Sequence, residues 1–118
     1  MATHEEISAG LQTFYEGYQN NAKLKLMNKD WNRVIMIKAN DIDSLHTITV
    51  SDGELSFVAE TTEREADLIV TSDSETLADL FYGDITPTEP YLNGSLIIKG
   101  SEDDILRLDF ISLMIWGE

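Results

Sequence analysis

The chain contains no cysteine, and this absence removes several kinds of chemistry at once. Without thiols a protein has no disulfide framework, no thiolate nucleophile, no iron–sulfur cluster and no cysteine zinc site. Long hydrophobic runs are also missing, because the longest nearly unbroken apolar stretch, residues 110–116, is far shorter than the ~20 residues that span a bilayer. The first residues lack the basic and then apolar regions of a signal peptide. We therefore expect a cytoplasmic protein.

Basic residues are scarce, with 8 Lys and Arg against 22 Asp and Glu and a formal net charge of −14. Nucleic acids attract proteins through Lys and Arg, so this charge argues against a nucleic-acid partner. Most of the bases gather in a basic island between residues 23 and 40, which consists of Lys23, Lys25, Lys29, Arg33 and Lys38. The island is either a solvated rim or a place of weak membrane contact through Lys23, Lys25 and Lys29.

Motifs for catalysis, metal binding and phosphate binding are missing as well. The sequence has no nucleophile elbow and no glycine-rich phosphate loop. The spacing that begins at Asp41 is similar to a calcium loop, but Leu45 and His46 stand where that loop needs a ligand and a glycine. An enzyme would have to use His46 as its base with Asp41 or Asp43, and a lone inward-facing histidine is more often a core residue. We expect no enzyme activity, no metal and no cofactor.

Length and composition fit a single domain over residues 1–118. A chain of 118 residues supports one core that buries roughly two thirds of its surface. Its 42% hydrophobic residues lie in the range of globular proteins, so a disordered chain is not expected.

The first half of the chain predicts one long helix and then strands. Thr3 and Glu6 form a capping-box pattern, and apolar residues at helical spacing follow it over residues 4–19. Residues 22–27 fit either a short helix or a strand. Residues 33–39 carry apolar side chains on both strand faces, so we expect both faces to be covered.

A hairpin should follow, because an Asp52-Gly53 pair stands between two alternating apolar runs. A two-residue loop pairs Ser51 with Glu54. That register places the apolar residues of both strands on one face, in the pairs Val50 with Leu55, Ile48 with Phe57 and His46 with Ala59. A slip by one residue would break this agreement between turn chemistry and alternation.

The second half predicts alternating strands and helices. The expected segments are a strand over residues 66–71, a helix capped by Ser72 and Glu75 and ended by Gly83, a loop over residues 84–93 that contains both prolines, a strand over residues 95–99 and a last helix capped by Ser101.

The last helix is apolar all round. Nine of the twelve positions from residue 105 to 116 are apolar, and on a helical wheel they point in every direction. Such helices are buried on more than one side. Another helix, a second subunit or a bound apolar ligand must therefore cover the side that does not meet the sheet.

Three segments of the second half resemble the sterol carrier protein type 2 family. They are Ala-Asp-Leu-Ile-Val-Thr-Ser-Asp over residues 66–73, the helix that ends in glycine over residues 77–83, and Pro-Tyr-Leu-Asn-Gly-Ser-Leu-Ile-Ile-Lys-Gly-Ser over residues 90–101. With the strand and the hairpin, the resemblance covers roughly residues 28–114. It implies an α+β domain, ordered α-β-β-β-crossover-β-α-β-α, in which helices cover a five-stranded mixed sheet. It also implies a non-catalytic apolar tunnel that holds sterols, fatty acids or acyl-CoA-like lipids.

The resemblance and the surplus apolar surface together give a functional hypothesis. The protein binds a lipid or another hydrophobic small molecule between the sheet and the last helix. The candidate lining residues are Ile97, Leu106, Phe110, Leu113 and Met114, with Phe81, Tyr91 and Leu92 near the opening. The alternative is a homodimeric protein-interaction module with a filled core and no lipid ligand.

Overall fold

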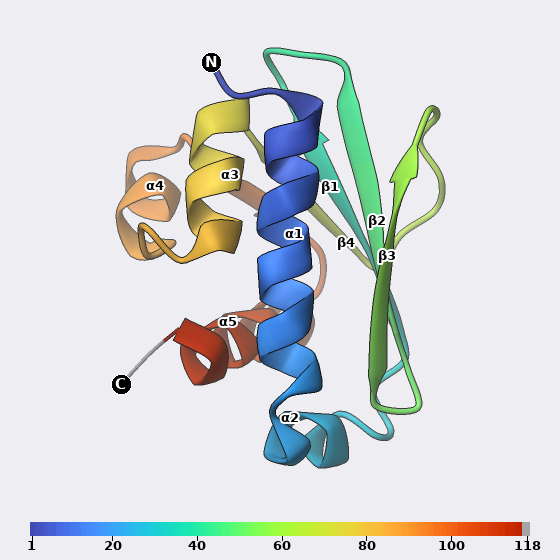
Figure 1. The fold of residues 1–118 in the computed structure, drawn as a ribbon. Coiled ribbons are helices and arrows are strands. Elements are labelled where there is room, and N and C mark those ends of the chain that lie inside the picture. The colour runs from blue at the N-terminus through green and yellow to red at the C-terminus, as the bar shows by residue number, and fades with distance from the viewer. Residues whose placement is uncertain (117–118) are drawn as a thin grey trace.

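The computed structural model describes residues 1–116, which form one sheet with helices packed against it (Figure 1). Its elements in chain order are α1 (His4–Gln19), α2 (Ala22–Met27), β1 (Arg33–Ala39), β2 (Ser44–Ser51), β3 (Glu54–Glu60), β4 (Leu68–Ser72), α3 (Ser74–Tyr82), α4 (Thr88–Asn93), β5 (Ile97–Lys99) and α5 (Glu102–Trp116). The five strands lie in the order β3-β2-β1-β4-β5, and β1 and β4 are parallel while the other pairs are antiparallel. This confirms the α+β class and the mixed sheet.

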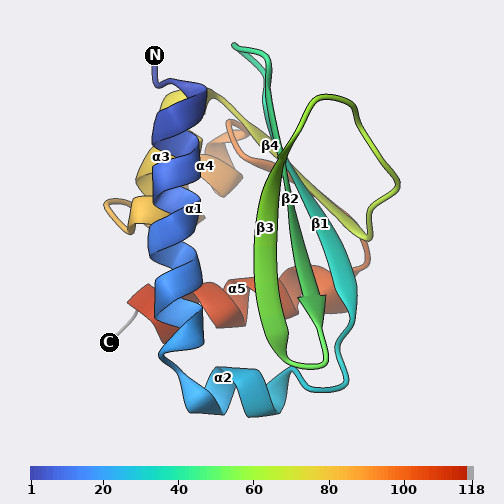
Figure 2. The ribbon, with the colours of Figure 1, turned by 45° about the vertical axis from the view of Figure 1, so that its right-hand side comes forward.

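The long helix α1 organises the helical side of the molecule. Figures 1 and 2 show it along the sheet, with α3 beside its first half and α2 and α5 near its end. Thr3 and Glu6 form the expected capping box, and the apolar stripe of α1 is buried in the core. A Cβ at Gly10 would lie only 3.2 Å from the carbonyl oxygen of Ala78, so the small residue lets α1 and α3 approach closely.

The hairpin register is confirmed pair by pair, from Ser51 opposite Glu54 to His46 opposite Ala59. Asp52 and Gly53 have φ angles of 53° and 83°, the left-handed geometry of a two-residue hairpin loop. The Tyr18 hydroxyl donates a hydrogen bond of 2.9 Å to the Gly53 carbonyl, which joins the end of α1 to the turn. Local turn chemistry and a distant contact therefore favour the same register.

Strand β1 is covered on both faces, as its sequence predicts. Ile35, Met36 and Ile37 are all buried, although adjacent side chains of a strand point to opposite faces. Because β3 and β4 lie on opposite sides of β1 and β2, the connection over residues 61–67 must cross the sheet. Lys38 on β1 pairs with Glu63 of this connection at 3.0 Å.

The predicted start of α3 is wrong by one residue. Asp73, rather than Ser72, caps the helix by accepting a hydrogen bond of 2.8 Å from the Thr76 amide. Ser72 is the last residue of β4, and its hydroxyl donates to the carbonyl oxygen of Ser95 instead. The strand therefore continues further than its local sequence indicates. Gly83 does end the helix, in a left-handed conformation.

The predicted loop over residues 84–93 is also wrong, because it contains the short helix α4. Pro87 is its N-cap residue and Pro90 lies in its first turn, where a backbone N–H has no partner within the helix. Proline is therefore compatible with this helix. The following strand begins at Ile97 rather than at residue 95, and Ser101 caps α5 as expected, accepting a hydrogen bond from the Asp104 amide.

Of the helices in residues 1–116, none has the length and apolar character needed to cross a membrane.

Candidate functional site

Helix α5 has one apolar side packed on the core and another apolar side in the open. Ile111 is fully buried, and the half-buried side chains of α5 also pack against the core. By contrast, Leu106, Phe110 and Leu113 are 60%, 44% and 57% exposed. Their spacing of four and three residues places them on one stripe of the helix. No part of the described chain covers this exposed stripe, which is the surplus apolar surface that the sequence predicts.

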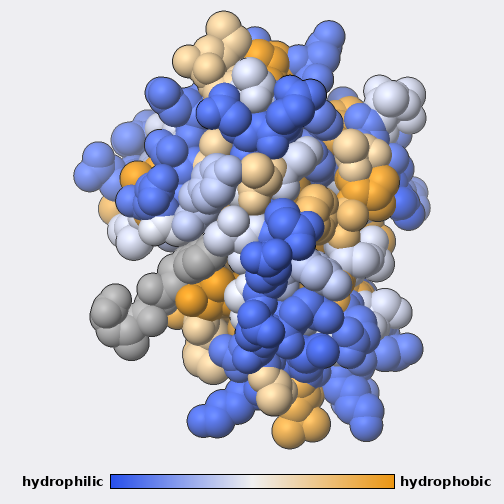
Figure 3. Space-filling view, in the orientation of Figure 1, coloured by the Kyte–Doolittle hydropathy of each residue, from blue (hydrophilic) through white to orange (hydrophobic). Residues whose placement is uncertain are grey.

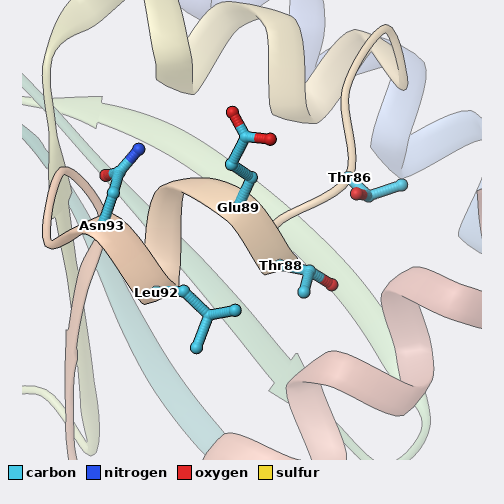
Figure 4. A pocket seen from close by; sticks show the side chains of 5 residues that line it. All are labelled: Thr86, Thr88, Glu89, Leu92 and Asn93. Atoms are coloured by element: carbon cyan, nitrogen blue, oxygen red, sulfur yellow. The ribbon is translucent and has the colours of Figure 1, made fainter.

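A hollow of about 530 Å³ lies beside α4, and its lining residues are Thr86, Thr88, Glu89, Leu92 and Asn93 (Figure 4). α4 and α5 lie one above the other on the same side of the molecule (Figures 1 and 2). Ile97 on the edge strand β5 is exposed on the other face of the sheet, because its neighbour Ile98 packs against the core, whereas Leu92 and the neighbouring Tyr91 are exposed on the side of α4 and α5. This side of the molecule therefore carries further uncovered apolar side chains besides those of α5.

A second hollow, of about 440 Å³, lies between α2 and the first half of α5. Its lining combines apolar Met27, Leu106 and Phe110 with charged Asp103 and Arg107. Two residues of the exposed stripe thus border a cavity whose rim carries one charge of each sign.

Buried polar contacts fix the first turns of α5. The Trp31 indole N–H and the Arg33 guanidinium both donate to the Asp104 carboxylate at 3.0 Å. Burial of Asp104 disfavours its charge, but the hydrogen bonds from Arg33, Trp31 and Ser101 outweigh that effect and hold the pKa of Asp104 below its ordinary value. The guanidinium groups of Arg33 and Arg107 also lie over the Trp31 ring, 5.7 and 5.5 Å from its centroid. The exposed stripe is therefore presented by a rigidly held helix.

The histidine considered as a catalytic base lies in a structural environment. His46 is 1% exposed, its Nε2 lies 2.6 Å from the Ser8 hydroxyl, and its ring stacks on that of His4 at 4.5 Å. Burial, together with the nearby His4, lowers the pKa of His46 to about 4. Asp41 accepts hydrogen bonds from the amide and the hydroxyl of Ser74, so it is engaged with another residue. Among residues 1–116 there is also no cluster of three or more potential metal ligands.

The eight residues expected to line a tunnel fall into two groups. Phe81 is buried in the core, edge-on to Phe14 at 5.4 Å between ring centroids, and Met114 is half-buried against the same core. The other six are exposed: Tyr91, Leu92, Ile97, Leu106, Phe110 and Leu113. Ile97 is separated from the others, because its neighbour Ile98 packs against the core and Ile97 points to the other face of the sheet.

Sequence reasoning missed three residues of the hollow between α2 and α5, Met27, Asp103 and Arg107. Met27 lies in the segment that fitted either a helix or a strand, so its direction was undetermined. Arg107 is the only basic residue of α5, and this lone charge on an apolar and acidic helix was the one sequence feature that could have marked it as a site residue.

Both the sequence and the fold of this chain are similar to those of known proteins. Residues 12–109 match the SCP-2 sterol transfer family, whereas none of the curated proteins compared matches the chain. The sterol carrier protein domain 2 of Helicoverpa armigera is a similar solved structure, with a TM-score of 0.68, 13% identity, and coverage of 96% of this chain and 90% of that one. The UbiJ-SCP2 ubiquinone synthesis protein has a TM-score of 0.68 and 13% identity, over 90% of this chain and 91% of that one.

A larger protein contains a similar fold. The stereoselective inverting sec-alkylsulfatase Pisa1 from Pseudomonas sp. matches 77% of this chain with a TM-score of 0.61 and 13% identity, but the match spans only 14% of the sulfatase. At these identities the solved structures show a common fold and nothing more. The match over residues 12–109 covers most of the sequence, and it shows that this chain belongs to the SCP-2 sterol transfer family.

Proposed function

We propose that this chain binds a hydrophobic ligand, such as a sterol, a fatty acid or an acyl-CoA-like lipid, without catalysing a reaction. The observation that carries the proposal is the exposed stripe of Leu106, Phe110 and Leu113 on a helix whose opposite side is fixed in the core. Membership of a sterol transfer family supports the same class of ligand.

The ligand would lie along α5 and reach toward α4. The stripe runs for about 10 Å along the helix axis, from Leu106 to Leu113. Met114 would extend the contact surface, and Tyr91 and Leu92 would border its entrance. Ile97 would not take part, because its neighbour Ile98 packs on the core and Ile97 therefore points to the other face of the sheet. Phe81 is buried where α1 and α3 pack together, and it would contribute apolar surface to the site from the core.

Apolar contact alone can drive this binding. Each methylene transferred from water contributes ~0.8 kcal/mol, so a dozen contribute roughly 10 kcal/mol before the cost of ordering the ligand and the side chains is subtracted. A polar anchor is therefore not required, and neutral ligands are compatible with the site.

The alternative occupant of the stripe is a second copy of the chain, since exposed large apolar residues on one helix stripe also suit a helix–helix interface. In a homodimer the stripe would be covered without any lipid. Sedimentation distinguishes lipid binding from dimerisation at the stripe. If the chain is a dimer, and Leu113→Gln converts it to a soluble monomer without changing ligand binding, the interaction module is favoured.

Native mass spectrometry of the purified protein and displacement of a fluorescent fatty acid test the proposal. We expect co-purified lipid and saturable displacement that Leu113→Gln weakens. Val58→Thr is the matched control, because Val58 is an exposed apolar residue on β3, at the edge of the sheet opposite to β5. No co-purified lipid and no displacement at micromolar protein would refute the proposal.

A further inference from the structure

One arginine of α5 carries a charge that no acid of the described chain neutralises. Arg107 and Arg33 both lie over the ring of Trp31. The Arg33 guanidinium pairs with the Asp104 carboxylate at 3.0 Å, so these two charges offset each other. Arg107 makes no ion pair within residues 1–116. In a chain with a formal net charge of −14, Arg107 is therefore an uncompensated cation.

Neutral groups hold the Arg107 side chain in place. Its Nη1 donates a hydrogen bond of 2.8 Å to the Asn28 side-chain oxygen, and its guanidinium lies 5.5 Å from the centroid of the Trp31 ring. Asn28 is itself fully buried and donates to the Leu24 carbonyl oxygen at 2.9 Å. A guanidinium has five N–H donors, and the other four of Arg107 have no partner in the described part of the chain. A fixed arginine with unused donors is suited to bind a carboxylate through two parallel hydrogen bonds.

Arg107 lines the hollow between α2 and α5, directly beside the exposed stripe. Leu106 and Phe110 of the stripe line the same hollow, and Met27 of α2 forms part of its opposite wall. Figure 3 shows apolar side chains at the surface over α5, with hydrophilic ones beside them. A molecule that places a polar group in the hollow would therefore meet a cation there and apolar side chains along the helix. This is the arrangement that an amphiphile with a charged end requires.

The other charged residues near the hollow favour a single negative charge. Lys23 lies one turn before Met27 on α2, hence on the same face of that helix, and it makes no ion pair within residues 1–116. Asp103 also lines the hollow but is exposed and makes no ion pair with Arg107, so solvent and salt screen its charge more than that of the half-buried arginine. The two cations outweigh this acid. Asp103 would still repel a second negative charge on the same ligand.

We propose that this hollow binds the carboxylate of a free fatty acid, with Arg107 as the anchor of the head group. The guanidinium donates two N–H bonds to the carboxylate oxygens, and the acyl chain runs from the hollow along Phe110 and Leu113. The inference rests on the proposed lipid-binding function and narrows its ligand class. A singly charged carboxylate binds more tightly than a neutral alcohol or sterol, and more tightly than a polyanionic acyl-CoA.

Isothermal titration calorimetry of the full chain with decanoate, 1-decanol and decanoyl-CoA tests the proposal, because these ligands share one chain length and differ in the head group. We expect decanoate to bind about tenfold more tightly than 1-decanol, as for the gain of one hydrogen-bonded charge pair. It should also bind more tightly than decanoyl-CoA. Added salt should lower the affinity for decanoate relative to that for 1-decanol.

Four variants locate the anchor. Arg107→Gln should weaken the binding of decanoate about tenfold more than that of 1-decanol, whereas Leu113→Gln should weaken both by a similar factor. Asp103→Asn removes only an exposed acid from the hollow and should strengthen decanoate binding about twofold, so it tests the anchor even if Arg107→Gln does not fold. Lys99→Gln is the matched control, because it removes an exposed base on the edge strand β5 and should change neither affinity.

Equal affinities for decanoate and 1-decanol would overturn the inference, as would decanoyl-CoA binding as tight as that of decanoate. The same holds if Asp103→Asn does not strengthen decanoate binding, or if Arg107→Gln folds and affects both ligands equally. In each of these cases the ligands still bind, so the proposed function stands without this anchor. If neither decanoate nor 1-decanol binds, the proposed function itself fails, and the two failures are thereby distinguishable.

Discussion

The buried histidine makes the stability of this fold depend on pH in a predictable direction. Burial, with the adjacent His4 ring, lowers the pKa of His46 from 6.5 to about 4, so the fold holds this imidazole in its neutral form. In the unfolded chain the same ring takes up a proton near its ordinary pKa. The stabilisation is therefore fully present above pH 6.5 and is lost as the pH falls from there toward 4.

The size of the effect follows from the two pKa values. Between about pH 8 and about pH 5, the unfolded state gains nearly one more proton than the native state at this site, which costs about 2 kcal/mol of unfolding free energy. Over the whole interval down to pH 4 and below, the loss approaches about 3 kcal/mol, and carboxylates such as Asp104 add their own losses at the acid end.

Urea unfolding at several pH values measures this loss, and His46→Gln is the variant that removes it. The glutamine side chain cannot titrate, so we expect a flatter dependence of stability on pH, whatever the variant's absolute stability. NMR titration of the His46 ring in the folded wild-type chain is an independent check. A ring that titrates near 6.5 in the folded protein, or equal slopes for both chains, would refute the reasoning.

Two further predictions concern the contacts that position α2 and α5, and urea unfolding measures both. Asp104→Asn weakens the hydrogen bonds that the carboxylate accepts from the buried Trp31 indole and the Arg33 guanidinium, and it should lower the free energy of unfolding by about 2 kcal/mol. A loss below about 0.5 kcal/mol would contradict the role given to this carboxylate. Gly53→Ala should cost more than Gly94→Ala: both glycines have a positive φ, worth about 1 kcal/mol of strain, but only at Gly53 does the added Cβ meet the Lys25 carbonyl oxygen. Equal losses for the two alanine variants would show that α2 does not pack on the turn as described.

The sequence predicts elements best where local chemistry and periodicity agree. The capping box at Thr3 and the Asp52-Gly53 turn are local signals, and the helix and the hairpin register that they predict are both confirmed. The start of α3 was misplaced because the Ser72 hydroxyl bonds to Ser95, a residue far along the chain. Helix α4 was missed because prolines usually indicate a loop, whereas the first turn of a helix accepts them.

The candidate site was predictable in character but not in detail. Composition alone indicated that α5 has more apolar surface than one packed side can use. Which residues stay exposed depends on the rotation of α5, and Asp104 fixes that rotation through contacts with Trp31 and Arg33. Likewise the Leu24 and Leu26 alternation suits a strand, and only the caps and the hairpin contact decide for a helix with Leu26 outward.

An electron-density map of the protein as purified tests the central claim most directly. If the chain carries a hydrophobic ligand, elongated density should run along Leu106, Phe110 and Leu113 and toward α4, and native mass spectrometry of the same sample should give the mass of a lipid. A map in which a second copy of the chain covers these side chains, or in which they face water with no lipid in the mass spectrum, would contradict the account.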